Sequence, residues 1–548
     1  MSRLAHEPSE MPQDPDATDV LIIGAGASGA AVAWSLARAG IGVTCLEQGG
    51  WLDRTDYPHE LPDWEMHRKT DFSNDPNVRG RPEDYPLNNA DTPIAPLMFN
   101  AVGGSTIHWA GHFPRFRPSD FRVRTLDGVA DDWPIVYEDL EPFYEENDIN
   151  VGVAGLNGDP ANPPRGPRPL PPVALDPAAY VFIDGLEKLG WHWWPADGAL
   201  LTAPYGDGRQ VCNRCGPCDL GCPNGAMSSA HVTYWPKALE LGARLVTHAR
   251  VREITVDARG RASGAVYYDR DGVARHQAAR AVVMACNGVG TPRLLLNSAS
   301  ALFPNGLANS SDYVGRNLMF HPIGFVSGEF DEDLVGYQGP LGVLLHCQEF
   351  YETDLSRGFV RGCQMQLHHD FGPLSTALGG FTAHRVPWGA DHHRVMRKRL
   401  GRTLSITAMT EDLPELHNRV TLDETLTDSH GIPAPKISYT LSDNTQRAVD
   451  FVVGRARELL ETCGAHEVRE LPCVPESGWH LMGTARMGND PETSVVDRWG
   501  RAHDVPNLFV VDASLFVTGA PVNPTSTIQA LALRTASWIG VHHREIAA

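Results

Sequence analysis

The N-terminal part of the chain carries the clearest alternation of apolar and small residues. Asp19–Ile23 is a short apolar run rich in β-branched side chains, which is typical of a buried parallel strand. After a glycine-rich turn, residues 30–40 (AAVAWSLARAG) have the apolar spacing of an amphipathic helix that ends at Gly40. Gly42–Glu47 reads as a second strand, so the pattern predicts a strand–helix–strand unit.

Beyond this unit the pattern predicts loops, a meander and a last helix. Residues 51–95 are rich in Asp, Pro and Asn and have no period, so we expect a loop there. Residues 155–172 predict a surface connection rich in proline and glycine. Residues 243–285 alternate as a β-meander with a turn at Asp271-Gly272. The other expected elements are strands near 404–409, 436–440 and 508–512 and a final helix over 524–541.

Composition and charge narrow the class of protein. The 548 residues are 42% hydrophobic and 21% charged, as in ordinary globular proteins, so wholesale disorder is excluded. The 46 Lys and Arg residues against 67 Asp and Glu residues give a net charge of −21, which repels nucleic-acid backbones and anionic lipid surfaces. No apolar run is long enough to cross a bilayer, and residues 1–17 are expected to form a disordered lead.

Gly24, Gly26 and Gly29 form a GxGxxG pattern at the turn between the first strand and the first helix. In such a turn the first glycine makes the tight bend, the second admits a pyrophosphate close to the backbone, and the third lets helix and strand pack closely. Glu47 ends the second strand, where its carboxylate can bind a ribose hydroxyl. The pattern predicts a dinucleotide site but does not separate NAD from FAD.

Motifs elsewhere in the chain distinguish an FAD site from an NAD site. They lie at 100–111 (NAVGGSTIHWAG), 285–296 (ACNGVGTPRLLL), 507–514 (NLFVVDAS) and 521–525 (PVNPT). Together with the glycine turn, they resemble the glucose–methanol–choline (GMC) family of FAD oxidoreductases over nearly the whole chain.

The resemblance implies an α/β fold with a Rossmann-type FAD-binding domain and an inserted α+β substrate domain built on an antiparallel sheet. We expect the FAD-binding domain to be discontinuous, formed by residues 18–112, 203–322 and 487–548. The substrate domain would then comprise residues 113–202 and 323–486.

The same resemblance assigns cofactor contacts. It places Gly103, Gly104 and Ser105 beside the flavin ring, where adjacent glycines allow close backbone approach. His108 matches a position that tethers the flavin covalently in some sugar-oxidising relatives; a hydrogen-bonded histidine that only lines the pocket is the equally weighted alternative. Val251 falls on the strand that contacts the adenine through backbone groups.

The last helix is also assigned a cofactor role. Asn523 followed by Pro524 is typical of a helix N-cap and first helical position, and the resemblance aims this N-terminus at the flavin. Its dipole would stabilise the negative charge of a reduced flavin. Asp512 is expected to contact the ribityl chain or a phosphate, and Thr525 to donate near the ring.

Oxidation of an alcohol needs a base for the hydroxyl proton and an acceptor for the hydride. Of 23 histidines, the family motif selects His480 as the base, in the segment GWHLMGT, and the second catalytic position falls on Asn523. An N-cap role would also explain Asn523. We expect a structural role for His321, and surface or loop positions for His368, His369, His392 and His393.

Four of the ten cysteines crowd into one segment: Cys212, Cys215, Cys218 and Cys222. Their spacing is that of a ferredoxin box, whose thiolates hold iron–sulfur clusters. Cys212, Cys218 and Cys222 also match the ligands of the iron–sulfur-bearing bacterial sugar dehydrogenases of the GMC family, which predicts a [3Fe–4S] cluster; Cys215 departs from that set. The alternative is four free thiols, as in family members whose similar boxes need no cluster.

These observations predict an FAD-dependent dehydrogenase that oxidises a hydroxyl of a sugar, glycoside or polyol. His480 would take the proton, flavin N5 the hydride, and the cluster would pass electrons to an external acceptor. The alternatives are an oxidase that returns electrons to O₂ without a cluster and a non-redox lyase that keeps FAD.

The expected partners are a small-molecule substrate, a small subunit, and a cytochrome or other electron acceptor, with neither nucleic acid nor membrane insertion. The acidic, polar N-terminal segment carries no export signal, which predicts a cytoplasmic protein; export with a partner subunit to the periplasm or cell surface stays open. Residues 394–402 form a basic run, expected to be a solvated helix face or a docking site for an acidic partner.

Overall fold

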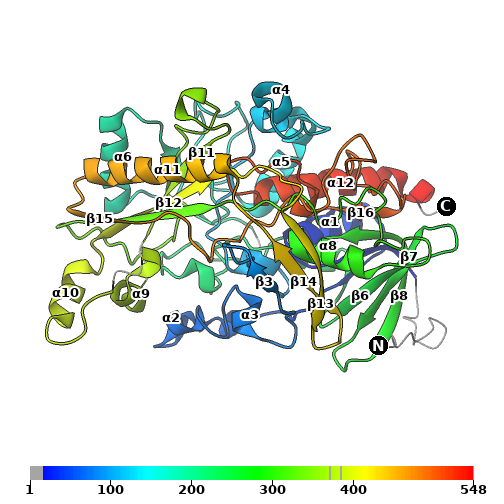
Figure 1. The fold of residues 1–548 in the computed structure, drawn as a ribbon. Helices are drawn as coiled ribbons and strands as arrows, with labels where there is room; N and C mark the ends of the chain where they lie inside the picture. The colour runs from blue at the N-terminus through cyan, green and yellow to red at the C-terminus, as the bar shows by residue number, and fades with distance from the viewer. Residues whose placement is uncertain (1–16, 207, 370–371, 383–384, 547–548) are drawn as a thin grey trace.

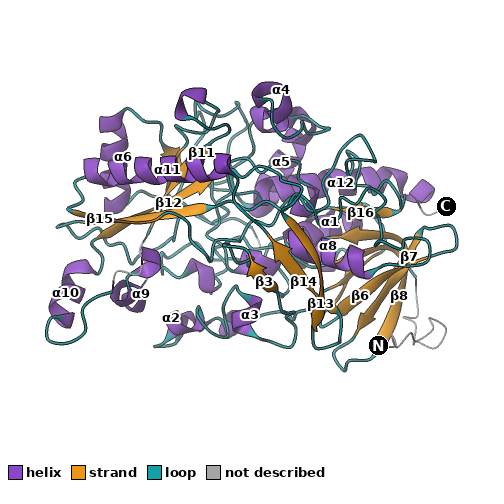
Figure 2. Cartoon of the chain, in the orientation of Figure 1, coloured by secondary structure: helices purple, strands orange, loops and turns teal. Residues whose placement is uncertain are grey.

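The computed structural model describes residues 17–206, 208–369, 372–382 and 385–546, so all but the last residue of the expected N-terminal lead lies outside the described part. Its elements gather into two larger sheets, with helices packed against them, and a small third sheet (Figures 1 and 2). The α/β class expected from the sequence is confirmed.

The first sheet has the order β5-β2-β1-β8-β7-β6, and β16 pairs with the remaining edge of β8. Strands β5, β2, β1, β8 and β16 run parallel, whereas β7 and β6 return as an antiparallel meander on β8. The bounds are β1 Thr18–Ile23, β2 Val43–Leu46, β5 Arg244–Val246, β6 Arg250–Val256, β7 Ala262–Tyr268, β8 Ala274–Met284 and β16 Leu508–Val510. The strands predicted in these segments are confirmed.

Helices cover this sheet. The predicted first helix is α1, Ala27–Arg38, and it packs against the predicted last helix, α12, Thr525–Ile546, and against α7, Tyr234–Glu240. All but two residues of α1 are buried, since it lies between the sheet and these helices. The other helices in this part of the molecule are α5 Tyr137–Val151, which packs on α12, α8 Asn287–Asn297, and the short α4 Val123–Asp127.

The second sheet is antiparallel and has the order β15-β9-β12-β11-β10-β4. Its strands are β4 Trp194–Pro195, β9 Ile323–Glu329, β10 Leu345–Cys347, β11 Cys363–His368, β12 Thr403–Thr410 and β15 Glu467–Leu471. Helix α11, Asp443–Thr462, lies along one face of it, and α6, Pro177–Leu189, packs on α11 (Figure 1). The short α9, Pro373–Leu378, and α10, His392–Arg399, pack on each other.

A small third sheet corrects one expectation. Residues 51–95, expected to be a loop, contain α2 Trp64–His67, α3 Pro76–Arg79 and β3 Asn88–Asp91. Strand β3 pairs with β14, Pro433–Ser438, which in turn pairs with β13, Arg419–Thr427. The partner of β3 lies more than 340 positions away, so the local pattern carried no sign of this strand.

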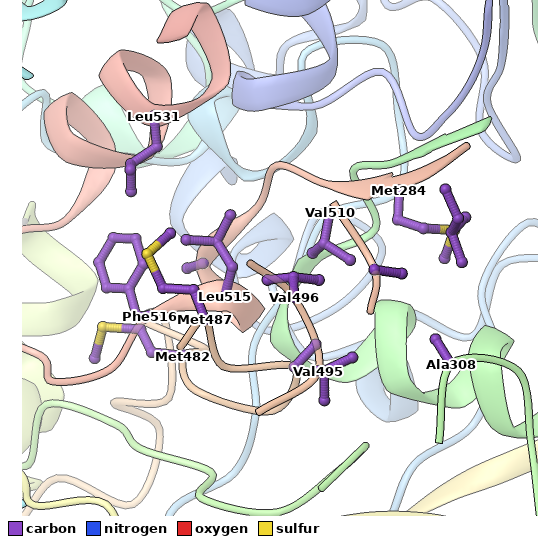
Figure 3. Close-up of a cluster of buried hydrophobic side chains, with 14 of the residues drawn as sticks. Met284, Ala308, Met482, Met487, Val495, Val496, Val510, Leu515, Phe516 and Leu531 are labelled. Carbon is purple, nitrogen blue, oxygen red and sulfur yellow. The ribbon is translucent and has the colours of Figure 1, made fainter. Parts of the chain in front are cut away.

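A large hydrophobic core holds the C-terminal segment against the first sheet. Figure 3 shows part of it, where side chains from β8, β16, α12 and the loops around residues 482–516 meet; they include Met284, Met482, Met487, Val495, Val496, Val510, Leu515, Phe516 and Leu531. All of these are nearly inaccessible to solvent. This packing fixes the loop that carries residues 480–487 next to the carboxyl ends of the parallel strands.

Candidate active site

One extended cavity lies between the first and second sheets. Its first wall contains the carboxyl ends of parallel strands: Ile23 and Gly24 at the end of β1, Leu46 and Glu47 at the end of β2, Ala285 after β8, and Asp512 after β16. Its opposite wall contains side chains of β9, β11 and β12. The carboxyl ends of parallel strands are where α/β folds bind nucleotides, so the cavity joins the predicted dinucleotide site to the second sheet.

The three glycines of the turn have different structural roles. Gly24 has φ +102°, and a Cβ there would come within 2.4 Å of the carbonyl oxygen of Ala285. A Cβ on Gly29 would lie 2.0 Å from the oxygen of Gly24. A Cβ on Gly26 would meet only the Cα of Gly104, at 4.0 Å, and would border the cavity. The fold itself requires the outer two glycines, and the middle one leaves space for a ligand.

Helix α1 begins at this turn without a side-chain cap, because its N-cap residue is Gly26 and no acidic residue occupies its first turn. The first N–H groups of a helix need partners, and together with the helix dipole they suit an anion such as a phosphate.

Two carboxylates and one strand residue expected to bind the cofactor line the same cavity. Glu47 accepts the backbone N–H groups of Ala25 and Gly49, each at 2.8 Å. Asp512 accepts from Thr291 Oγ1 at 2.5 Å and from a neighbouring N–H. Burial raises the pKa of both carboxyls, while these hydrogen bonds act in the opposite direction. Val251, on β6, lines the cavity as well.

The segment 103–108 forms another side of the cavity. Gly104, Ser105 and His108 line it, whereas Gly103 makes the turn behind them with φ +101°. His108 is buried and its ring packs at a tilt against that of Phe99, with ring centroids 4.1 Å apart. Its Nε2 has no hydrogen-bond partner, and burial lowers the pKa of the ring well below the usual value. A neutral imidazole with an unpartnered Nε2 therefore stands at the position expected to tether or line the flavin.

His480 and Asn523 come from distant segments and line this cavity together with Pro524 and Thr525. His480 Nδ1 lies 2.7 Å from Nδ1 of His321. Burial, and then the neighbouring His321, lower the pKa of His480 well below its usual value, so its ring is neutral near neutral pH.

Asn523 does not serve as the predicted helix cap. Helix α12 begins at Thr525, and the Asn523 side-chain oxygen accepts from Nε2 of Gln366 at 2.6 Å instead of from a helix N–H. Gln366, on the second sheet, holds the side-chain oxygen of Asn523, so the Asn523 amide lies at the cavity and does not cap the helix.

The second sheet contributes a largely apolar wall. Ile323, Phe325, Leu341, Met409 and Val474 form one hydrophobic cluster, and all five line the cavity. The polar side chains on this side include His112, Gln366, His368 and Thr407.

One histidine prediction was wrong. His368 lies on β11, lines the cavity and has its pKa lowered to about 4 by burial. His369 follows the strand at a loop position, as expected, but it is buried, with its Nδ1 2.7 Å from the carbonyl oxygen of Pro340. Strand β11 points His368 inward, and the sequence could not tell which face of the strand was buried. His112 and Gln366 were missed because no local signal distinguishes them from other polar residues. On α10, His393 is exposed as expected and His392 is partly exposed.

The four clustered cysteines line one small hollow beside Pro340 and Met227. Cys215 is exposed, and the other three are partly buried. Backbone N–H groups of Arg214 and Met227 point at the sulfurs of Cys212 and Cys222, at 3.4 and 3.3 Å. Among the described residues, no three His, Cys, Asp or Glu side chains are placed to hold a single metal ion.

Burial keeps the Cys218 thiol protonated in the absence of a metal. It raises the pKa of Cys218 well above the usual value, and the neighbouring thiols add to this shift. A metal centre at this position would have to displace this proton, since the thiolate is the ligand.

Comparisons with known proteins find matches along most of the chain. Models of the GMC oxidoreductase family match residues 172–323 and 414–532, and a model of the NAD(P)-binding Rossmann-like domain matches residues 22–80. The chain is 44% identical to 2-methyl-1,2-propanediol dehydrogenase of Mycolicibacterium austroafricanum, over 98% of this chain and 97% of that protein.

Two further likenesses cover nearly the full length. The fructose dehydrogenase large subunit of Gluconobacter japonicus is 31% identical over 95% of this chain and 97% of its own. The crystal structure of pyridoxine 4-oxidase from Mesorbium loti superposes with a TM-score of 0.63 over 96% of this chain and 99% of that one, at 19% identity, which is a likeness of fold.

Proposed function

The chain belongs to the GMC oxidoreductase family, and we propose that it is an FAD-dependent dehydrogenase that oxidises a hydroxyl of a polyol, sugar or glycoside. One observation carries the proposal: a neutral histidine and an amide side chain, His480 and Asn523, line the same cavity as the glycine turn and the ends of the parallel strands. A base and a nucleotide site in one cavity are what alcohol oxidation by a flavin requires.

The residues around the cavity fit FAD. The backbone at Gly26 is open to the cavity, the first turn of α1 is uncapped by any side chain, and the buried Nε2 of His108 and Oδ1 of Asn74 lack partners. Glu47, Val251, Asp512 and the 104–108 segment would hold the cofactor. When bound, FAD supplies the hydride acceptor for the reaction.

The chain's own residues would handle the proton. His480, neutral and partly buried, accepts the proton of the substrate hydroxyl, and the Asn523 amide holds the hydroxyl oxygen. The cluster of Ile323, Phe325, Leu341, Met409 and Val474 excludes water from the reacting hydroxyl.

This apolar wall also favours small polyols over sugars within the proposed substrate class. A sugar with a hydroxyl on every carbon would leave several of them facing aliphatic and aromatic side chains, which costs free energy for each unpaired group. A small polyol with apolar substituents matches the wall better, and the relative at 44% identity is named for such a diol.

We further propose that Cys212, Cys218 and Cys222 hold an iron–sulfur cluster. The donor chemistry is suitable, since the sulfurs line one hollow and two of the three accept backbone N–H groups, which tune such clusters. The thiols of a cluster bind different irons, so they need not converge on one point as the ligands of a single ion do. When bound, a cluster passes electrons singly to a partner such as a cytochrome. Four free thiols would favour the oxidase alternative.

The domain division stays a proposal with the boundaries expected from the sequence. The strands of the first sheet fall within 18–112, 203–322 and 487–548, and those of the second fall within 113–202 and 323–486. The small sheet joins β3 of the first set to β14 of the second, so it would tie the two domains together. Among the described residues, no helix has the length and apolar character to span a membrane.

The test is anaerobic reduction of the protein's flavin by a panel of short diols, longer polyols and sugars. We expect bleaching of the flavin absorbance near 450 nm with a branched short diol, and at least about 100-fold slower bleaching in His480→Ala with its FAD retained. The matched control is His503→Asn, since His503 contacts Ser494 away from the cavity. Bleaching by no alcohol in the panel, or wild-type speed in His480→Ala, would contradict the proposal.

A further inference from the structure

His321 stands behind His480 and has a defined protonation. Its Nε2 lies 2.6 Å from the carbonyl oxygen of Ala520. A carbonyl can only accept, so Nε2 of His321 carries the hydrogen and donates it. Burial lowers the pKa of His321 to about 4, so the ring is neutral near neutral pH and has one N–H only. Its Nδ1 is therefore a bare acceptor.

This acceptor decides the tautomer of His480. The two Nδ1 atoms are 2.7 Å apart, and since that of His321 is bare, that of His480 must carry the hydrogen. The ring of His480 is neutral as well, so its Nε2 is left unprotonated. His321 does not line the cavity, and a Cβ on Gly519 would come within 3.2 Å of its Nε2, so the ring is closely confined from behind.

A second chain of hydrogen bonds decides the orientation of the Asn523 amide. Arg117, which can only donate, gives a hydrogen bond to Oε1 of Gln348 at 2.8 Å. The amide nitrogen of Gln348 then points to Oε1 of Gln364 at 3.4 Å, and that of Gln364 to Oδ1 of Asn523 at 3.5 Å. Nε2 of Gln366 donates to the same oxygen at 2.6 Å. With its oxygen engaged by two amides, Asn523 keeps its NH₂ group for another partner.

We propose that His321 and Gln366 are positioning residues that fix the hydrogen-bond polarity of the pair: His480 as the acceptor and Asn523 as the donor. A hydroxyl group offers one hydrogen and one oxygen, so this polarity matches it, whereas the opposite tautomer of His480 would present an N–H that cannot take a proton. The inference rests on the function proposed above and adds the residues that prepare the pair before substrate arrives.

The first experiment compares His321→Leu with His321→Asn in the FAD-loaded protein. Leucine removes the acceptor for His480 Nδ1, so we expect flavin reduction by substrate to slow by about 100-fold, with KM and FAD content little changed. Asparagine keeps an acceptor oxygen close to the former Nδ1, so we expect it to restore the rate to within about 10-fold of wild type. His503→Asn is again the control.

The outcomes separate the inference from the proposed function. If His480→Ala is slow but His321→Leu reduces at the wild-type rate, or if the leucine and asparagine variants are equally slow with FAD retained, the positioning role is wrong and the base assignment stands. If His480→Ala itself reduces at the wild-type rate, the proposed function fails first.

A spectroscopic readout needs no turnover. In protein labelled with ¹⁵N-histidine, the signals lost in His480→Gln identify His480, and we expect them to show the Nδ1-protonated tautomer at pH 7.5. In His321→Leu the Nε2-protonated form should become populated. A wild-type His480 protonated on Nε2 would overturn the inference.

The second experiment separates polarity from packing at residue 366. Gln366→Met keeps the volume and removes the donor, so we expect the limiting reduction rate to fall by about 10-fold. Gln366→Glu keeps the shape but can only accept, which forces the Asn523 amide to turn its oxygen toward the substrate, so its rate should fall further. A glutamate variant as fast as the methionine variant would contradict the proposed role of Gln366 in orienting the Asn523 amide.

Discussion

The middle glycine of the turn gives the sharpest test of the cofactor site. Gly26 has φ −74° and ψ −160°, which any residue can adopt, and a Cβ there meets no protein atom closer than 4.0 Å. Gly26→Ala should therefore fold, and its cofactor-free form should differ from wild type by no more than about 1 kcal/mol in unfolding free energy. Alanine also restricts the unfolded chain, which favours the folded state.

This substitution should weaken the binding of FAD. The new methyl group would stand where the backbone otherwise approaches the pyrophosphate, at the N-terminus of α1. We expect FAD affinity to fall by about 100-fold, which corresponds to about 2.7 kcal/mol. The stabilisation that bound FAD confers on the folded protein should shrink by a similar amount at a fixed FAD concentration.

Gly29→Ala is the matched contrast. Its Cβ would lie 2.0 Å from the oxygen of Gly24, inside the packed contact between helix and strand. No small shift relieves such an overlap, because both atoms belong to the backbone or are bonded to it. We expect this variant to lose the folded state whether or not FAD is supplied.

The assay is the flavin-to-protein ratio of each purified protein, with thermal unfolding by circular dichroism before and after addition of FAD. Gly26→Ala should be folded and poor in flavin, and Gly29→Ala should be unfolded. A Gly26→Ala protein that purifies with full FAD would refute the placement of the pyrophosphate, and one that fails to fold would refute the steric argument.

Three other predictions concern the base, the tether and the cysteines. Because burial lowers the pKa of His480 below its usual value of 6.5, the active unprotonated form persists on acidification, so kcat/KM should stay level through pH 6.5 and decline only below it; a decline centred above pH 7 would contradict this. Any flavin that remains with acid-precipitated wild-type protein should be released in His108→Ala, because His108 lines the cavity and its nucleophilic Nε2 has no hydrogen-bond partner; flavin retained in the variant would exclude this tether. Anaerobically purified protein should contain about three irons per chain with matching acid-labile sulfide, retained in Cys215→Ser and lost in Cys218→Ser; iron-free protein with full FAD would support the oxidase alternative.

The local pattern of the sequence was sufficient for the strand–helix–strand unit, the meander and the last helix. Each of these elements has a period or a turn signal within its own residues, and the parallel strands follow from short apolar runs. The GxGxxG turn and the family motifs likewise pointed to cavity-lining residues. Gly24, Glu47 and Asp512 stand next to the ends of predicted strands, whereas His108, His480 and Asn523 were assigned by the motifs alone.

The local pattern of the sequence predicted the strand boundaries and the loops less accurately. The strand expected near 436–440 lies at Pro433–Ser438, and the loop expected at 51–95 contains β3. Both strands belong to the small third sheet, where each is stabilised by pairing with the other rather than by its own propensity.

Only the tertiary structure decided how the site residues act on one another. His321 was expected to be structural, yet it contacts His480 across 159 positions of sequence. Asn523 was expected at the second catalytic position, with a helix-cap role as the other explanation, and its oxygen is held by Gln366 across 157 positions. Periodicity reports which face of an element is buried, but it carries no information about which distant side chain meets that face. Whether a histidine is an acceptor or a donor depends on that partner, because the second nitrogen takes its role from the hydrogen bond made by the first.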